Sequence, residues 1–219
     1  MPSRSVAAVA LTLIVSARPG PSAHRLDEYL QAARIAIDPE RVHIELDLTA
    51  GMAIADVVIG EIDRDRTGTI SADEEQAYAA VVQDAIRLEV DGAPLHLELT
   101  GRRFPGIDAV RNGEGAIRLE LAAVIGAVSA GPHHLLYRNT HRPDIGVYLA
   151  NVLVPASDRV AVTGQRRDVE QRQLVVDYAL RGDPAASVRG WLLPNIGGLL
   201  LVLGALWWRH RKCEAPGLE

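Results

Sequence analysis

Hydrophobic and polar residues alternate with a period of two along several short stretches of the chain. Two such stretches, residues 33–38 and 41–49, flank the turn residues Asp38-Pro39-Glu40. Because successive side chains of a strand point to opposite faces, each stretch predicts a strand with one buried face. Together they predict a hairpin.

The same alternation recurs farther along the chain. Residues 86–90 and 95–99 flank Asp91-Gly92, a dipeptide typical of a tight hairpin turn. Further short strands are predicted at residues 117–121, 135–138, 147–154, 159–163 and 174–180. About eight short strands with turns between them predict a mainly β fold, specifically a β-sandwich.

Between residues 50 and 85 the periodicity becomes helical. Ile54, Val58 and Ile62 recur at intervals of four residues, and a second apolar stripe contains Tyr78 and Val82. Such stripes are typical of amphipathic helices that bury one face. This region therefore predicts two helices joined by a loop and inserted between strands of the sandwich.

The loop between the two predicted helices reads DRDRTGTISADE, residues 63–74, and has the oxygen-bearing residues that Ca²⁺ requires. A calcium loop supplies about six to eight oxygen ligands, including a backbone carbonyl from its seventh position and a bidentate carboxylate from its twelfth. The candidate ligands stand at positions 1, 3, 5, 7, 9 and 12: Asp63, Asp65, Thr67, Thr69, Ser71 and Glu74. We therefore predict one calcium site.

Residues 50–85, including both helices, resemble the EF-hand calcium-binding family. Gly68 stands where that family makes a sharp turn, and Ser71 and Glu74 form an S-x-x-E capping box for the second helix. Thr67 replaces the family's Asp or Asn, and no second loop of this kind occurs in the sequence. The resemblance implies a structural site with a Kd of about 10⁻⁴–10⁻³ M rather than a sensor. The alternative is a polar turn, which also uses Asp and Gly.

Residues 1–23 have the features of a secretory signal peptide. Arg4 precedes a short apolar run at residues 6–15, and small residues follow it. Cleavage after Ala17 and cleavage after Ala23 both fit this pattern.

Residues 190–208 are uncharged and long enough to cross a bilayer as a helix. A basic cluster at residues 209–212 follows at once and predicts a cytoplasmic tail, residues 209–219. We therefore expect residues 24–189 to form a periplasmic or otherwise extracytoplasmic domain, held by one transmembrane helix in the inner (cell) membrane of a bacterium.

The composition of residues 24–189 excludes several classes of function. This segment has 18 arginines, no lysine and 26 acidic residues, a formal charge of −8, which suits cations and disfavours nucleic acid. Cys213 is the one cysteine of the chain and lies outside the segment, which excludes a cysteine-rich zinc site there. No G-x-S-x-G, H-E-x-x-H or glycine-rich phosphate loop is present. We predict that the protein is not an enzyme.

The histidines support a second hypothesis, in which the protein binds a transition metal. If cleavage follows Ala23, His24 becomes the N-terminal residue, and its amine and imidazole could chelate copper together. The other histidines of the segment lack zinc spacing and are interpreted as surface or turn residues: His43, His96, His133, His134 and His141.

Three stretches are similar to the exterior N-terminal domains of bacterial nickel/cobalt-type permeases. They are HRLDEYLQAARIAI (24–37), IELDLTAG (44–51) and the helix pair. In those permeases a bundle of membrane helices follows, whereas one predicted helix follows here. The resemblance implies an accessory role in the handling or transport of Cu, Ni or Co, with a membrane or periplasmic protein as partner. That role is the alternative to a non-enzymatic, membrane-anchored calcium-binding module.

Overall fold

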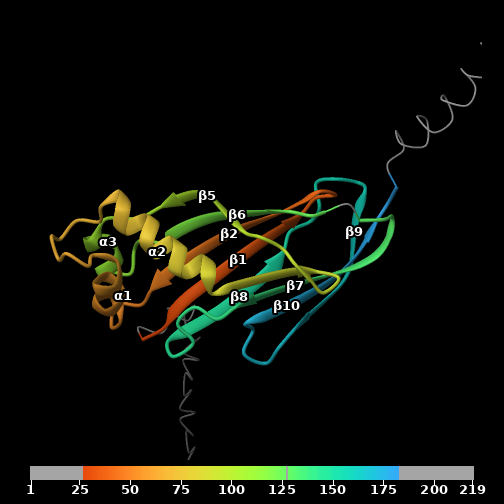
Figure 1. Ribbon diagram of the computed structural model, residues 1–219. Helices are drawn as coiled ribbons and strands as arrows, with labels where there is room; N and C mark the ends of the chain where they lie inside the picture. Colours follow the sequence, from red (N-terminus) through yellow and green to blue (C-terminus); the bar gives the residue numbers. More distant parts are fainter. Residues whose placement is uncertain (1–26, 127, 183–219) are drawn as a thin grey trace, which may run out of the picture.

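The computed structural model describes residues 27–126 and 128–182 (Figure 1). The predicted signal peptide (1–23), membrane helix (190–208) and cytoplasmic tail (209–219) lie outside these residues, as does His24. Within them, no helix has the length and apolar character needed to span a bilayer.

The described residues form two five-stranded sheets, so the predicted mainly β fold is confirmed. Ten strands are present where the sequence predicted about eight. The first sheet has the order β5-β6-β2-β1-β8 and contains β1 (Tyr29–Ile37), β2 (Arg41–Ala50), β5 (Glu98–Arg103), β6 (Ile117–Val124) and β8 (Gly146–Val152). The second has the order β4-β3-β7-β10-β9 and contains β3 (Ile86–Val90), β4 (Ala93–Pro94), β7 (Gly131–Asn139), β9 (Val160–Arg167) and β10 (Gln173–Leu180).

The first predicted hairpin is present, with β1 and β2 paired antiparallel. Ile35 lies opposite Ile44, and Ala33 lies opposite Leu46, with all four side chains buried. The other edge of β1 pairs in parallel with β8, and Ala33 lies opposite Ala150 there. The period-two pattern did not predict this parallel pair.

The second predicted hairpin is much shorter than expected. Asp91 and Gly92 both have positive φ, 52° and 81°, and make the expected tight turn. After that turn only the two residues of β4 pair with β3, whose other edge pairs with β7. Pro94 has no N–H to donate to a longer ladder. The chain then moves to the first sheet, where β5 pairs with β6.

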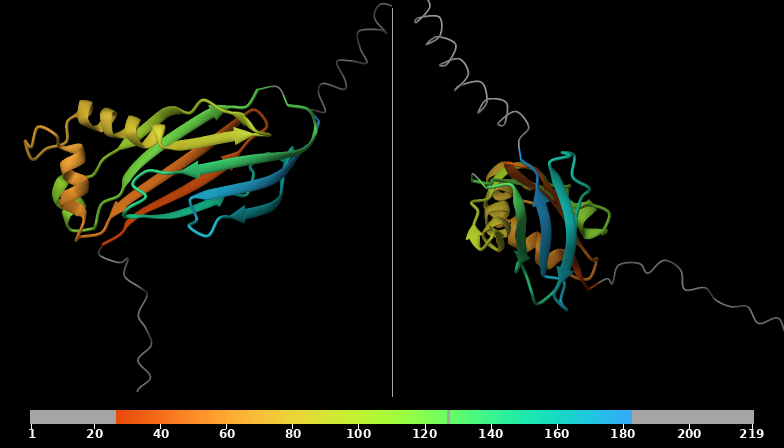
Figure 2. Two further views of the ribbon diagram at one scale, coloured as in Figure 1. Left: turned by 60° about the horizontal axis from the view of Figure 1, so that its bottom comes forward. Right: turned by 90° about the vertical axis from the view of Figure 1, so that its right-hand side faces the viewer.

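Three helices accompany the sheets: α1 (Ala55–Ile62), α2 (Ala72–Asp84) and the short α3 (Ile107–Arg111). The predicted helix pair is therefore confirmed, whereas α3 was not predicted. The helices α1 and α3 lie at one end of the sheets, near the start of β1, and α2 runs from that end along the sheets to the start of β3 (Figures 1 and 2).

One hydrophobic core contains residues from both sheets and from the helices. Leu46 and Leu119 of the first sheet and Leu174 and Val176 of the second are fully buried. Val58 of α1 belongs to the same core. The helical insert is thus packed on the sheets and is not a separate unit.

Candidate metal site

The loop of residues 63–71 joins α1 to α2, and both of its ends are fixed by hydrogen bonds. Asp63 caps α1, and its backbone N–H donates to Ile59 O at 2.8 Å. Ser71 caps α2: its hydroxyl accepts from the Glu74 N–H, and the Glu74 carboxylate accepts from the Ser71 N–H. The predicted capping box is therefore confirmed.

Three predicted ligands converge in this loop. Carboxylate oxygens of Asp63, Asp65 and Glu74 all lie within 4.8 Å of one another. Asp63 is 6 % exposed, Glu74 is half-buried and Asp65 is exposed. In residues 27–126 and 128–182 no other set of three His, Cys, Asp or Glu side chains comes together in this way. The three carboxylates supply a formal charge of −3 to a cation.

The backbone of the loop folds around Asp63. Its Oδ1 accepts from the Thr67 N–H and its Oδ2 from the Gly68 N–H, both at 3.0 Å. Gly68 has a φ of +79°, a left-handed conformation that glycine adopts without strain. The Thr67 hydroxyl donates to Thr69 O at 3.2 Å. The hydroxyl and the carbonyl that were predicted as ligands are therefore neighbours.

Glu74 reaches back across the loop from the first turn of α2. Its Oε2 accepts from the Ser71 N–H and hydroxyl at 3.0 and 2.8 Å, and its Oε1 accepts from the Arg64 N–H at 2.8 Å. These bonds, with those from Ser71 foremost, lower the pKa of Glu74. The carboxylate is therefore ionised and held at the loop. The Ser71 hydroxyl takes part in the N-terminal cap of α2, and by its bonds to Glu74 it positions the Glu74 carboxylate.

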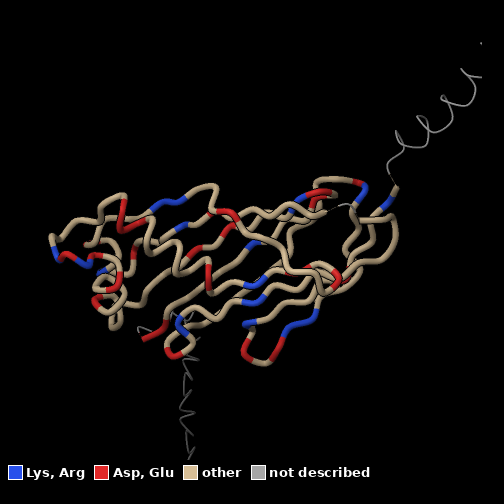
Figure 3. The backbone as a smooth tube through the Cα atoms, in the orientation of Figure 1, with Lys and Arg blue, Asp and Glu red and all other residues tan. Residues whose placement is uncertain are grey.

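Acidic and basic residues alternate closely along this loop (Figure 3). Arg64 and Arg66 are both exposed. The carboxylates of Asp63 and Asp65 bond the backbone N–H groups of the loop. The side chains of the two arginines thus reduce the local negative potential, and within the described residues neither side chain bonds a candidate ligand atom.

The helices that carry the loop are joined to the sheets by polar contacts that the sequence did not predict. The hydroxyl oxygens of Tyr78 in α2 and Tyr29 in β1 lie 2.7 Å apart, and the Tyr78 hydroxyl lies 3.2 Å from His141 Nε2. Glu61 of α1 forms an ion pair with Arg142. Tyrosines within apolar stripes were the available signal, since a buried tyrosine hydroxyl usually finds a partner.

Two histidines that were interpreted as surface or turn residues, His133 and His141, are buried. His141 does lie in a bend after β7, whereas His133 lies within β7, so the interpretation is wrong for His133. His141 is 5 % exposed, and burial lowers its pKa to about 4, so it is neutral. His133 is 6 % exposed, and its ring lies beside that of Tyr178, with 5.5 Å between the ring centroids. His43, His96 and His134 are exposed.

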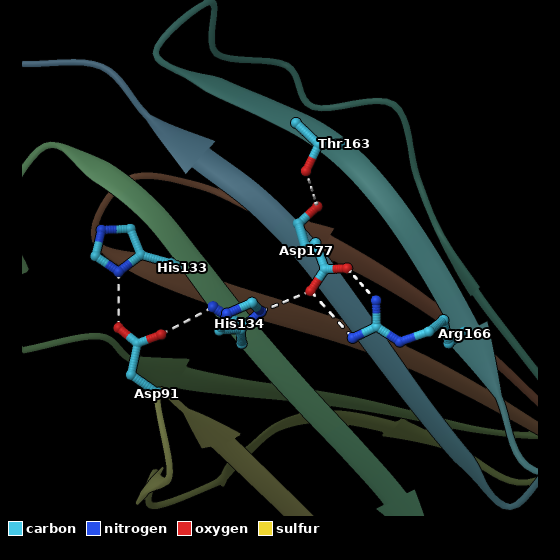
Figure 4. A network of polar contacts seen from close by, with 6 residues as sticks. All are labelled: Asp91, His133, His134, Thr163, Arg166 and Asp177. Carbon is cyan, nitrogen blue, oxygen red and sulfur yellow. Dashed lines mark hydrogen bonds and ion pairs between the residues drawn. The ribbon is translucent and has the colours of Figure 1, made fainter.

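His133 and His134 belong to a polar network on the second sheet (Figure 4). His133 Nδ1 lies 2.7 Å from Asp91 Oδ2, and its Nε2 lies 2.7 Å from Ser129 O. His134 Nδ1 lies 2.6 Å from Asp177. Both histidines therefore have carboxylate partners, and no histidine of the described residues joins a group of three metal-ligating side chains.

Comparison with known proteins found no match for this chain among protein-family models, curated proteins or solved structures.

Proposed function

We propose that this protein is a non-enzymatic calcium-binding module of the EF-hand type, in which one Ca²⁺ stabilises the helical insert of a β-sandwich. The observation that supports this function best is the convergence of Asp63, Asp65 and Glu74 within 4.8 Å. These residues stand at positions 1, 3 and 12 of the loop, where a calcium loop has its acidic ligands.

The donor atoms favour calcium over other metals. The loop offers carboxylate, hydroxyl and carbonyl oxygens and neither nitrogen nor sulfur side-chain ligands. Such donors suit Ca²⁺ and Mg²⁺ rather than copper, nickel or zinc. A glutamate at the twelfth position can bind with both oxygens, and this larger shell fits Ca²⁺ better than octahedral Mg²⁺.

A structural role follows from how the insert is attached. Tyr78 of α2 forms a hydrogen bond with Tyr29 of β1, and Glu61 of α1 forms an ion pair with Arg142. Because the helices are already joined to the sheets, a bound cation would close the loop between two fixed points. With a Kd of about 10⁻⁴–10⁻³ M, a tenfold excess of calcium adds about 1.4 kcal/mol to the free energy of unfolding.

We also propose that the module lies outside the cytoplasm of a bacterium and is anchored in the inner membrane by residues 190–208. The uncharged run and the basic cluster after it support the anchor. A partner would then be a membrane or periplasmic protein. Calcium concentrations outside the cytoplasm match the weak affinity expected of such a loop.

Thermal unfolding of the purified chain with and without calcium tests the site. At about 10 mM Ca²⁺ we expect the Tm to rise by about 3–10 °C, and we expect Glu74→Gln to abolish the rise. Asp73→Asn is the matched control: this exposed residue lies in the same helical turn, and its substitution removes the same charge without removing a ligand. A calcium response that survives Glu74→Gln would refute the assignment. Calorimetric titrations with Cu²⁺ and Ni²⁺ test the transition-metal alternative.

A further inference from the structure

A pocket lies beside the cation loop, between α1, α2 and the segment of residues 140–142 that follows β7. Its volume is about 490 Å³, within the range of small-molecule sites. The three carboxylates of the cation site do not line it. The pocket is therefore a second candidate site in the same part of the molecule.

Among the described residues, one arginine of the pocket, Arg64, has no carboxylate partner. Arg142 forms ion pairs with Glu61 and with Asp144, the latter at 2.8 Å. The Arg64 side chain also lines the pocket, and its Nε contacts only the Glu61 carbonyl oxygen, at 3.4 Å, among the described residues. His141 adds no charge because it is neutral. A ligand with a single negative charge would balance Arg64.

Another wall of the pocket is apolar and open. Val81 of α2 is 47 % exposed and lines this wall together with Ala85. Gly60 stands inside α1, where glycine costs about 0.5–1 kcal/mol relative to alanine. Apart from the adjacent residues and the backbone of α1 itself, no atom lies within 4 Å of the place that a Cβ would take there, and φ is not positive. Neither packing nor backbone conformation requires this glycine, and its effect is to keep the pocket open.

The floor of the pocket is polar and rigid. Tyr78 and His141 line it and are 2 % and 5 % exposed. The Tyr78 hydroxyl lies within hydrogen-bonding distance of both His141 Nε2 and the Tyr29 hydroxyl. Their positions are fixed before a ligand arrives, which lowers the entropic cost of binding.

We propose that this pocket binds a monocarboxylate with a short apolar body, whose carboxylate pairs with Arg64 and whose apolar body lies along Val81 and Gly60. Two kinds of molecule present this chemistry: a free short-chain organic acid and the C-terminal residue of a peptide. The three carboxylates of the cation site do not line this pocket, so the proposal does not rest on calcium binding.

Binding is tested on the full chain in lipid nanodiscs, by calorimetric titration at one fixed calcium concentration with empty nanodiscs as the blank. The probes are pentanoate for a free acid and N-acetyl-leucine for a peptide C-terminus, each beside its neutral amide. We expect saturable binding of at least one carboxylate and binding of its amide that is weaker by about tenfold. The tighter of the two carboxylates identifies the source of the ligand.

Three variants locate the binding. Arg64→Gln is expected to weaken carboxylate binding by about tenfold. Arg66→Gln, an exposed position of the same loop that does not line the pocket, is expected to leave it unchanged. Gly60→Leu should fill the pocket and abolish binding. The proposal is overturned if neither carboxylate binds, if the amides bind as well, or if Arg66→Gln weakens binding as much as Arg64→Gln does.

Discussion

Replacing Tyr78 by phenylalanine removes the middle hydroxyl of a buried chain of three side chains. The Tyr78 hydroxyl lies 2.7 Å from the Tyr29 hydroxyl and 3.2 Å from His141 Nε2. Tyr29, Tyr78 and His141 are 0 %, 2 % and 5 % exposed. Tyr78 is the one partner of the Tyr29 hydroxyl among the described residues. The substitution therefore leaves this hydroxyl buried and unpaired.

The loss of stability depends on whether the substituted tyrosine is in the middle or at the end of this hydrogen-bonded series. A buried polar group without a partner costs about 1–3 kcal/mol, whereas the net loss of one hydrogen bond costs about 0.5–1.5 kcal/mol. Tyr78→Phe is expected to lower the free energy of unfolding by the larger amount. Tyr29→Phe is expected to lower it by the smaller amount, because Tyr78 keeps His141 as a partner. In the double variant no tyrosine hydroxyl is stranded, so its loss should be smaller than the sum of the two single losses.

Urea unfolding of the unmodified protein, the two single variants and the double variant, at one pH and one calcium concentration, measures these differences. Tyr178→Phe is the control, because the Tyr178 hydroxyl is buried and has no partner within the described structure. Removing an unpaired buried hydroxyl should leave stability unchanged or increase it. The reasoning fails if Tyr29→Phe costs as much as Tyr78→Phe, or if the two losses add in the double variant.

Three further predictions concern other parts of the fold. The pKa of His133 is raised, mainly by its hydrogen bond to Asp91, so its stabilising effect should be complete below about pH 6.5 and lost as the pH rises through the raised pKa. The urea midpoint should decrease as the pH rises over this range, and the decrease should be smaller in Asp91→Asn. An equal decrease in both proteins would contradict this prediction. Leu46→Ala should lower the free energy of unfolding by about 2–5 kcal/mol, because Leu46 is fully buried in β2; a loss below about 1 kcal/mol would contradict the core packing. Gly68→Ala should destabilise the protein by about 1 kcal/mol, since its φ is +79°, whereas Gly60→Ala should stabilise it by about 0.5–1 kcal/mol; thermal unfolding shows whether the two signs differ.

The sequence predicted which residues form strands better than it predicted which strands pair. Alternation identified the buried faces of β1 and β2, because it depends only on neighbouring positions. The parallel pairing of β1 with β8 joins Ala33 to Ala150. No local pattern carries that information. The short second hairpin shows the same limit, since Asp91-Gly92 specified the turn and not the length of the ladder after it.

The convergence of Asp63, Asp65 and Glu74 could be predicted because the three residues lie within one stretch of twelve residues. Their spacing along a loop between two helices brings the three carboxylates together. The contacts that hold this stretch against the sheets are different, because Tyr29, Tyr78 and His141 are separated by 49 and 63 residues. The burial of His141, and with it a pKa of about 4, depends on those distant partners. The residues next to His141 in the sequence therefore do not show whether it is exposed or buried. Its burial depends on Tyr78 of α2, which bonds Tyr29 of β1.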